Sequence, residues 1–277
     1  MKPKFIIFIA FYICATFHGV AQTYIECVDS ADYYIRREMW SDAERMTIAA
    51  LKQKPALKTN YILWSNLGDI RTALKEYPQA LQAFEIALTT VPDKERPRIL
   101  NNRAFSYLNT GDETHALEDI TESLAIDSIQ EWPLKMRGML KLGKANYSDA
   151  ERDLNSLKRH FPKNASSYMG LGQIEAFKGN SAKAEEYLRK SLELEQNEEA
   201  WFYLILLNIE SDKLPKAKDD LLVALKRYPR CGNLYLLRGL LHKKNYENDA
   251  ALIDKKIAQD YGADPHLVER FFPQITK

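Results

Sequence analysis

Residues 61–94, YILWSNLGDIRTALKEYPQALQAFEIALTTVPDK, contain the pattern that decides the fold. Small and apolar residues recur in this stretch at helical intervals, at Trp64, Leu67, Gly68, Ala80, Phe84, Ala87 and Pro92. The first three fall on one face of a first helix, and the two alanines with Phe84 fall on one face of a second. Gly68 and Ala80 are small where the two helices must approach closely, and Phe84 fills the space beside them. Pro92 stops the second helix because proline has no N–H to donate.

The spacing resembles that of the tetratricopeptide repeat (TPR) family, a helix–turn–helix unit of thirty-four residues. The family pattern is W-x2-L-G-x2-Y, then A-x3-F, then P, and only its tyrosine is missing here, where Arg71 stands. Neither helix of such a unit buries its apolar face alone, so one unit requires neighbours. The alternative is an ordinary helical hairpin in a bundle, which predicts no internal repetition.

Repetition is found along the whole chain, at the alanine that begins each second helix. This alanine recurs at Ala43, Ala80, Ala116, Ala150, Ala184, Ala217 and then Ala250 or Ala251. The steps are 37, 36, 34, 34, 33, and 33 or 34 residues. A period so regular favours stacked repeats over a bundle. We therefore predict an all-α protein, and the resemblance implies a right-handed α-solenoid (superhelix) of about seven TPR helix–turn–helix units.

The predicted organisation has three parts: a signal peptide at 1–21, a TPR solenoid at 22–263 and a C-terminal capping segment at 264–277. The predicted units lie near 24–57, 61–94, 97–130, 131–164, 165–197, 198–231 and 232–263. Later units keep the pattern in part, with Gly138 and Gly172 at the glycine position and Trp201 at the tryptophan position. The second helix of the last unit is irregular, because Asp254 or Lys255 falls where an apolar residue is expected. Terminal repeats are commonly atypical, since one of their faces meets water.

The first residues have the pattern of a secretory signal peptide. Lys2 and Lys4 precede an apolar run at 5–17, and Gly19-Val20-Ala21 follows it, so we expect cleavage after Ala21. The thirteen apolar residues are fewer than the ~20 that span a bilayer. The prediction is therefore an exported protein, periplasmic or secreted, with no stable membrane span after cleavage. The run with its Ala-Gln junction resembles exported proteins of Gram-negative bacteria of the Bacteroides type.

The charge balance argues against a nucleic-acid partner. Without Lys2 and Lys4, 37 of the 39 basic side chains remain against 38 acidic ones, a net charge of −1. A surface that follows phosphates requires a basic excess or a basic stripe. The basic clusters of this chain lie near expected helix ends, where they complement the helix dipole.

No pattern in the sequence indicates catalysis, a cofactor or a metal ion. Four histidines lie outside the signal peptide, at His115, His160, His242 and His266, and none has a metal-ligand partner at a recognised spacing. A phosphate loop and a GxSxG elbow are both missing. Cys27 and Cys231 belong to the first and sixth expected units, too far apart for a disulfide. We therefore predict a protein that is not an enzyme.

The resemblance places the binding surface of the protein on the concave side, which the first helices of successive units line. Methionine, aromatic and other side chains expected there form a set beyond what the repeat core needs: Asn102, Phe105, Trp132, Met136, Met139, Met169, Phe202, Tyr203, Leu206 and Leu237. Such side chains adapt in shape and bury much area, as peptide-binding grooves require. The predicted function is a non-catalytic scaffold of the cell envelope that binds a protein or peptide partner in this groove.

Two alternatives remain for the same residues. They pack against adjacent repeats as core, or the groove is closed by the chain's own C-terminal segment or by a second copy. The second alternative predicts that Leu267 and Phe271 pack inside. Some TPR co-chaperones grip a peptide carboxylate with lysine, asparagine and arginine on three successive first helices. Of that set only Asn102 has a match here, so a chaperone-tail partner is not expected.

Overall fold

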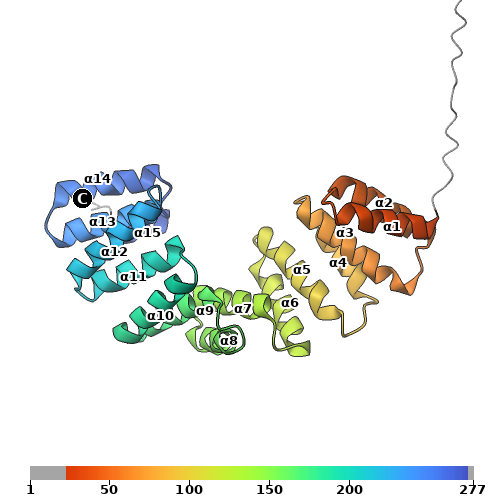
Figure 1. The fold of residues 1–277 in the computed structure, drawn as a ribbon, viewed down its shortest axis with the longest axis horizontal. Helices are drawn as coiled ribbons and strands as arrows, with labels where there is room; N and C mark the ends of the chain where they lie inside the picture. Colours follow the sequence, from red (N-terminus) through yellow and green to blue (C-terminus); the bar gives the residue numbers. More distant parts are fainter. Residues whose placement is uncertain (1–22, 274–277) are drawn as a thin grey trace, which may run out of the picture. The chain divides into compact units, whose positions relative to one another are not determined.

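The computed structural model describes residues 23–273, and in that part of the chain every regular element is helical. Fifteen α-helices and one short 3₁₀ helix follow one another along the described residues, with no strand among them. Fourteen of the α-helices form seven hairpins (Figure 1). The prediction of an all-α solenoid of about seven repeats is confirmed. The chain divides into two compact units, unit 1 (Met1–Pro92) and unit 2 (Asp93–Lys277). The predicted signal peptide lies outside the described residues.

Unit 1 contains two hairpins, which pack against each other through α2 and α3. Its elements are α1 (Tyr24–Ile35), α2 (Trp40–Gln53), η1 (Lys58–Asn60), α3 (Tyr61–Ala73) and α4 (Tyr77–Leu88). A capping box begins α1: the Thr23 side chain accepts from the Glu26 N–H, and the Glu26 carboxylate accepts from the Thr23 N–H at 2.7 Å. Arg71, which stands at the family's tyrosine position, donates to Glu44 of α2 at 2.8 Å. The departure from the pattern therefore joins the two hairpins.

The contact between α3 and α4 explains why the repeat needs a small residue at position 68. A Cβ atom added to Gly68 would lie 2.4 Å from Cε1 of Phe84, closer than any two carbon atoms pack. Ala80, Phe84 and Ala87 are fully buried, whereas Trp64 is only partly buried against the core of unit 1. The glycine therefore sets the distance between the helices, and the phenylalanine fills it.

Unit 2 contains five hairpins and a final short helix. The hairpins are α5 (Arg96–Asn109) with α6 (Glu113–Ile126), α7 (Glu131–Gly143) with α8 (Tyr147–His160), α9 (Ala165–Phe177) with α10 (Ser181–Leu194), α11 (Glu198–Glu210) with α12 (Leu214–Arg227), and α13 (Gly232–Lys244) with α14 (Asn248–Asp260). The last helix is α15 (Pro265–Phe271). The first helices α7, α9, α11 and α13 also touch one another in series, so they form a common layer, which we call the first-helix layer.

A left-handed residue lies in the turn of every hairpin. The positive φ angles fall at Glu38, Lys75, Gly111, Ala145, Gly179, Asp212 and Tyr246. Only two of the seven are glycine, although this conformation costs other residues roughly 1–2 kcal/mol. The turn geometry is therefore imposed by the packing of the two helices and not by local preference.

Three hairpins of unit 2 contain an arginine–aspartate pair at the same repeat position. Arg103 donates to Asp119, and Arg137 to Asp153, each through two hydrogen bonds of 2.6–2.8 Å. In the last hairpin Arg238 pairs with Asp254 in the same way, at 2.9 and 2.6 Å. The second helix of that hairpin is therefore not irregular at Asp254: its acid is buried because a first-helix arginine neutralises it.

The helix α15 covers the end of the first-helix layer. It packs on α13 and α14, beside which Figure 1 shows it. Phe271 and Phe272 are each 7% exposed, and the Phe272 ring would lie 3.0 Å from a Cβ at Gly239. Asp264 caps α15 by accepting from the His266 N–H. The described part of the segment 264–277 thus shields apolar surface that would otherwise face solvent.

Candidate functional site

Four of the ten residues predicted to line a groove are buried in the core, although Leu206 and Phe202 also each line a hollow described below. Leu237 is fully buried, and Met169, Phe202 and Leu206 are between 5 and 8% exposed. All four belong to one hydrophobic cluster, formed by α9–α14 together with Val268, Phe271 and Phe272 of the C-terminal segment. The reason is that α9, α11 and α13 contact neighbours on both sides: their own second helix, and the first helices next to them. These four residues therefore contribute to the core of unit 2.

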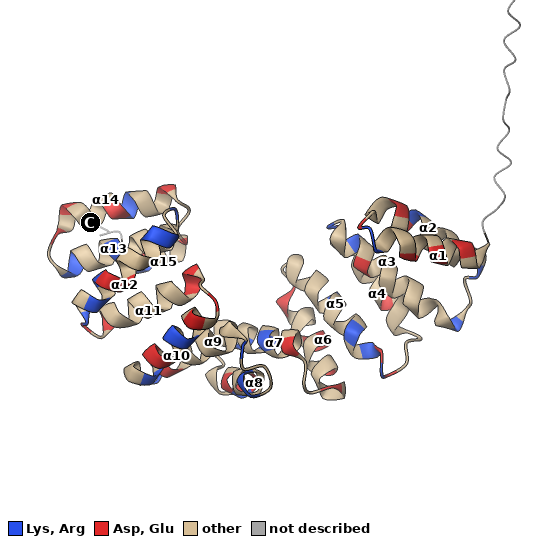
Figure 2. Cartoon of the chain, in the orientation of Figure 1, with Lys and Arg blue, Asp and Glu red and all other residues tan. Residues whose placement is uncertain are grey.

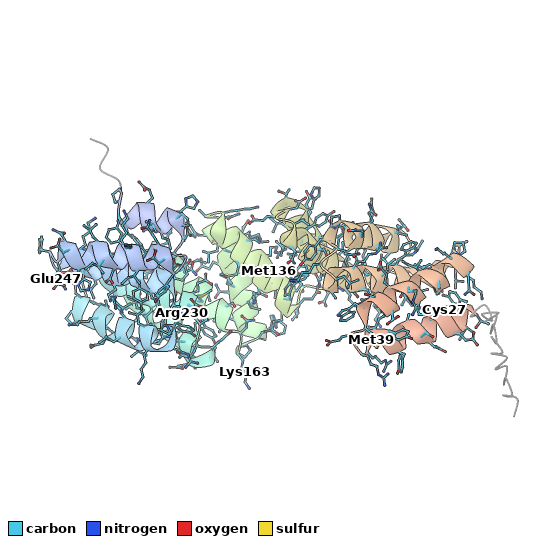
Figure 3. The ribbon with its side chains drawn as sticks, turned by 90° about the horizontal axis from the view of Figure 1, so that it is seen from above. Cys27, Met39, Met136, Lys163, Arg230 and Glu247 are labelled. Atoms are coloured by element: carbon cyan, nitrogen blue, oxygen red, sulfur yellow. The ribbon has the colours of Figure 1, made fainter. Side chains whose placement is uncertain are left out.

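The other predicted residues keep some exposed surface. Phe105 is 45% exposed and meets the edge of Trp132 at 6.3 Å between ring centroids. Asn102, Trp132, Met136, Met139 and Tyr203 are partly buried. Met136 lies on α7 (Figure 3). Of these residues, the structure brings Met139 and Tyr203 to one hollow; Asn102, Phe105, Trp132 and Met136 do not line it.

This hollow, the central hollow, has a volume of about 500 Å³ and lies on the first-helix layer. Its walls come from α7, α9 and α11, with Tyr147 from the start of α8, Leu188 from α10 and Arg270 from α15. The three first helices place equivalent positions side by side. One row is Met139, Gln173 and Leu206, and the next row, one turn later, is Gly143, Phe177 and Glu210. The hollow is therefore a product of repetition, because each of two repeat positions contributes three residues to it.

Polar groups of the central hollow are unequally satisfied. Nε2 of Gln173 is buried and has no hydrogen-bond partner among the described residues. Arg270 of α15 pairs with Glu210 at 3.3 Å. Glu199 keeps exposed surface, but it lies in a hollow whose walls displace water, and this burial raises the pKa of its carboxyl. No hydrogen bond or ion pair of Glu199 occurs in the part of the chain that the structure describes.

Aromatic rings stand at the edge of the same hollow. Tyr147 and Phe177 stack at 4.0 Å between centroids, and Phe177 is 66% exposed although it is a large apolar side chain. Tyr203 lies one helical turn after Glu199 on α11. Burial, with a smaller contribution from the Glu199 charge, raises the pKa of the Tyr203 hydroxyl. Exposed aromatic surface beside a hollow is typical of a binding site. At other places on a protein surface, such exposure lowers solubility.

A second hollow, the terminal hollow, has a volume of about 370 Å³ and lies between α11, the start of α13 and α15. It is lined by Glu198, Glu199, Phe202, Tyr203, Cys231, Asn233, Asp264 and Leu267. Burial and a hydrogen bond with Glu198 raise the pKa of the Cys231 thiol to about 11. A thiol with so high a pKa is protonated at neutral pH and is a poor nucleophile. The only cysteine at either hollow is therefore unsuited to catalysis.

Across residues 23–273, no group of three or more histidine, cysteine, aspartate or glutamate side chains could hold a metal ion. Within the same range no helix has the length and apolar character that crossing a bilayer requires. The chemistry that the described hollows offer is thus apolar contact, aromatic contact, hydrogen bonding and negative charge.

Gln173, Glu199, Phe177 and Tyr147 were not among the predicted site residues. A signal for Gln173 and Phe177 exists in the sequence, since residues spaced by the repeat length occupy one row. Met139 and Leu206 were predicted, and Gln173 lies between them in the same row. Apolar character alone does not identify Gln173, although a lone amide in an apolar row is the kind of group that orients a ligand. Glu199, which belongs to neither row, and Tyr147, on a second helix, have no such signal.

Comparisons with known proteins agree with this architecture. The sequence model of a family described as "Tetratricopeptide repeat" matches residues 28–97 and 135–199. A tetratricopeptide repeat protein from Parabacteroides merdae is 25% identical, and the similarity covers 90% of this chain and 96% of that one with a TM-score of 0.70. The C-terminal part of a TPR protein from Cytophaga hutchinsonii is 14% identical over 86% of this chain and 97% of its own, with a TM-score of 0.62.

A third solved structure is that of YrrB, described as a TPR protein with an unusual peptide-binding site. It is 17% identical, covers 69% of this chain and 92% of its own, and has a TM-score of 0.54. No curated protein matches the sequence. At such identities the second and third structures support the fold alone.

Proposed function

Because the chain belongs to the tetratricopeptide repeat family, whose stacked hairpins serve as scaffolds for protein–protein contacts, we propose that it is a non-catalytic scaffold that binds a peptide segment in the central hollow. The segment is a free peptide or an extended stretch of a protein partner. The observation that carries the proposal is the unsatisfied Nε2 donor of Gln173 in an otherwise apolar row of the hollow.

An amide donor buried without an acceptor costs roughly 1–3 kcal/mol, because it has lost water and gained no partner. An extended peptide offers a carbonyl oxygen at every residue, so it can supply the missing acceptor. Met139 and Leu206, on either side of Gln173, offer apolar surface to the neighbouring side chains of such a peptide. YrrB, of the same fold, is described as having a peptide-binding site, which supports this class of ligand.

The size of the hollow fits this class. A volume of about 500 Å³ is within the range of about 300–1,000 Å³ of small-ligand sites. It holds a few side chains of a peptide and not a folded domain. We therefore expect recognition of a short motif, with the remaining contacts made along the first-helix layer.

The test is selection of binders from a random peptide display library on the purified chain without residues 1–21, with Phe177→Ser as the variant. Phe177 is 66% exposed, so its loss should not unfold the protein, yet enriched peptides should bind the variant at least about tenfold more weakly. The matched control is Leu222→Ser on α12, which removes an apolar side chain of similar exposure, 61%, away from the hollow. Equal affinity of the enriched peptides for wild type, variant and control would refute the proposed site.

Closure of the groove by the chain's own C-terminal segment is the second candidate, and it has support at one end. Phe271 is buried and Leu267 packs partly against the same cluster. Arg270 reaches Glu210 at the border of the central hollow. Yet Phe177 is 66% exposed, so closure of the layer by the C-terminal segment is partial. Replacing Arg270 by Ala removes its ion pair without touching the buried rings; unchanged peptide affinity would assign α15 a purely structural role.

We further propose that the protein is exported and acts in the periplasm or outside the cell. The support is the apolar run at 5–17, preceded by Lys2 and Lys4, and the small residues before Gln22. Expression of the full chain in a Gram-negative host, followed by mass spectrometry of the product, tests this. A mature chain that begins at Gln22 in the periplasmic fraction is expected, and an intact chain in the cytoplasm would contradict it.

A further inference from the structure

The charges around the two hollows do not balance. Three charged residues line the central hollow, and two of them, Glu210 and Arg270, neutralise each other. Glu199 is left without a counter-ion among the described residues. The terminal hollow adds Glu198 and Asp264 and no basic side chain. Figure 2 shows α11, the helix between the two hollows, with acidic residues at its ends and no basic one.

Because the surroundings of Glu199 are apolar, its unpaired negative charge weakens the binding of any ligand that does not neutralise it. A carboxylate that loses water against a neutral ligand gains nothing in return, and its desolvation opposes binding. An acidic ligand would add repulsion, because the one arginine at the hollow is already paired. A basic side chain would replace the lost water with a charge-assisted hydrogen bond.

The walls also fit the rest of a basic side chain. Lysine and arginine have long apolar stems, which pack on surfaces such as those of Met139 and Leu206. Cations are attracted to aromatic faces, and Tyr203 and the Tyr147–Phe177 pair provide these at the same hollow. Negative charge, aromatic faces and an apolar floor thus meet in one place.

Resting on the proposed function, we propose that the bound peptide segment carries a lysine or arginine whose charged group pairs with Glu199 against these aromatic rings. A backbone carbonyl of the same segment accepts from Nε2 of Gln173. The partner is therefore recognised by a basic residue among apolar ones, and acidic segments are excluded.

The experiment measures, by fluorescence anisotropy, the affinity of three short, terminally blocked, leucine-rich peptides that differ at one central position: lysine, norleucine or glutamate. Wild type should bind the lysine peptide about tenfold or more tightly than the norleucine peptide, and the glutamate peptide most weakly. In Glu199→Gln the lysine and norleucine peptides should bind alike. In Glu199→Lys the order of lysine and glutamate should reverse.

The control variant is Glu195→Gln, which makes the same change of charge at an exposed residue that lines neither hollow. It should keep the preference for lysine. Equal affinities of wild type for the lysine and norleucine peptides would overturn the inference. The proposed function would survive that result if Phe177→Ser still weakened both peptides, and it would fall with the inference if Phe177→Ser weakened neither.

Discussion

The hairpins α3–α4 and α7–α8 share one backbone arrangement but differ at its centre. In α3–α4 the position before the glycine is Leu67, and it faces Ala83 in an apolar core. In α7–α8 the equivalent residues are Arg137 and Asp153, joined by two hydrogen bonds of 2.8 and 2.7 Å. The repeat therefore constrains the space between the two helices of a hairpin, and it does not constrain the chemical character of the side chains that fill this space. An apolar pair and a neutralised charged pair fill the same place.

The largest effect is expected where the charged version of the contact is broken. Asp153→Ala leaves Arg137, whose side chain is only 18% exposed, without its partner, and also removes the partner of Lys141. The free energy of unfolding of unit 2 should fall by about 3–5 kcal/mol, the usual cost of breaking a buried pair. Urea denaturation followed by circular dichroism measures this.

The double variant Arg137→Leu with Asp153→Ala, which copies Leu67 and Ala83, is the matched control. It should recover most of the lost stability, because replacing both members of a buried ion pair by apolar residues is often neutral. A double variant less stable than Asp153→Ala alone would show that the two hairpins are not interchangeable at this position.

This comparison also separates what the sequence could predict from what it could not. Gly68, Ala80 and Phe84 recur at fixed spacing because helix contacts have a fixed size, so helices and hairpins followed from the pattern. The charge pairs did not follow, since Arg238 and Asp254 lie sixteen residues apart and only the packed hairpin brings them together. In the sequence alone, Asp254 is therefore an irregularity, because its partner is not visible there.

The residues of the candidate site likewise divide into those that the sequence could predict and those that it could not. Met139 and Tyr203 could be predicted to line the hollow because the resemblance placed them on inward faces. Phe202 could not be distinguished from its neighbour Tyr203, since both are aromatic and adjacent on a helix with apolar residues on every side. Which of the two side chains is buried depends on the rotation of α11 about its axis and on the packing of α15, which lies outside the repeats. The spacing of the repeat encodes neither the rotation nor this packing.

A smaller effect is expected at a partly exposed charge cluster, where Glu185 of α10 meets Arg189, Lys213 and Lys216. Burial acts to raise the pKa of Glu185, but hydrogen bonds from Lys216 and Arg189 outweigh it and lower the pKa to about 2 from an ordinary 4.5. The ionised carboxylate therefore stabilises the fold above pH 4.5. This contribution is lost as the pH falls from 4.5 towards 2.

Glu185→Gln should lower the free energy of unfolding by about 1 kcal/mol at neutral pH, less than the buried pair, because water screens the cluster. The difference from wild type should vanish near the bottom of that pH range. Glu186→Gln, an exposed neighbour with the same change of charge, is the control and should have no such pH dependence. A loss for Glu185→Gln that stays constant down to pH 2 would contradict the assigned role.

Effects no larger than that of Glu185→Gln are expected in the turns, where α7–α8 can be compared with α5–α6. Ala145 has a φ of 57°, and Gly111, at the same place in α5–α6, has a φ of 81° with open space around its missing Cβ. Gly111→Ala should therefore cost about 1 kcal/mol through backbone strain alone. Ala145→Gly relieves the same strain but gives the unfolded chain more freedom, so its gain should be no more than a few tenths of a kcal/mol. Thermal unfolding of the two variants measures both signs. A gain in stability for Gly111→Ala, with a loss for Ala145→Gly, would mean that the turn accepts alanine without strain. The packing of the hairpins, which also accepts Arg137 in place of leucine, would then set the turn without opposition from the backbone.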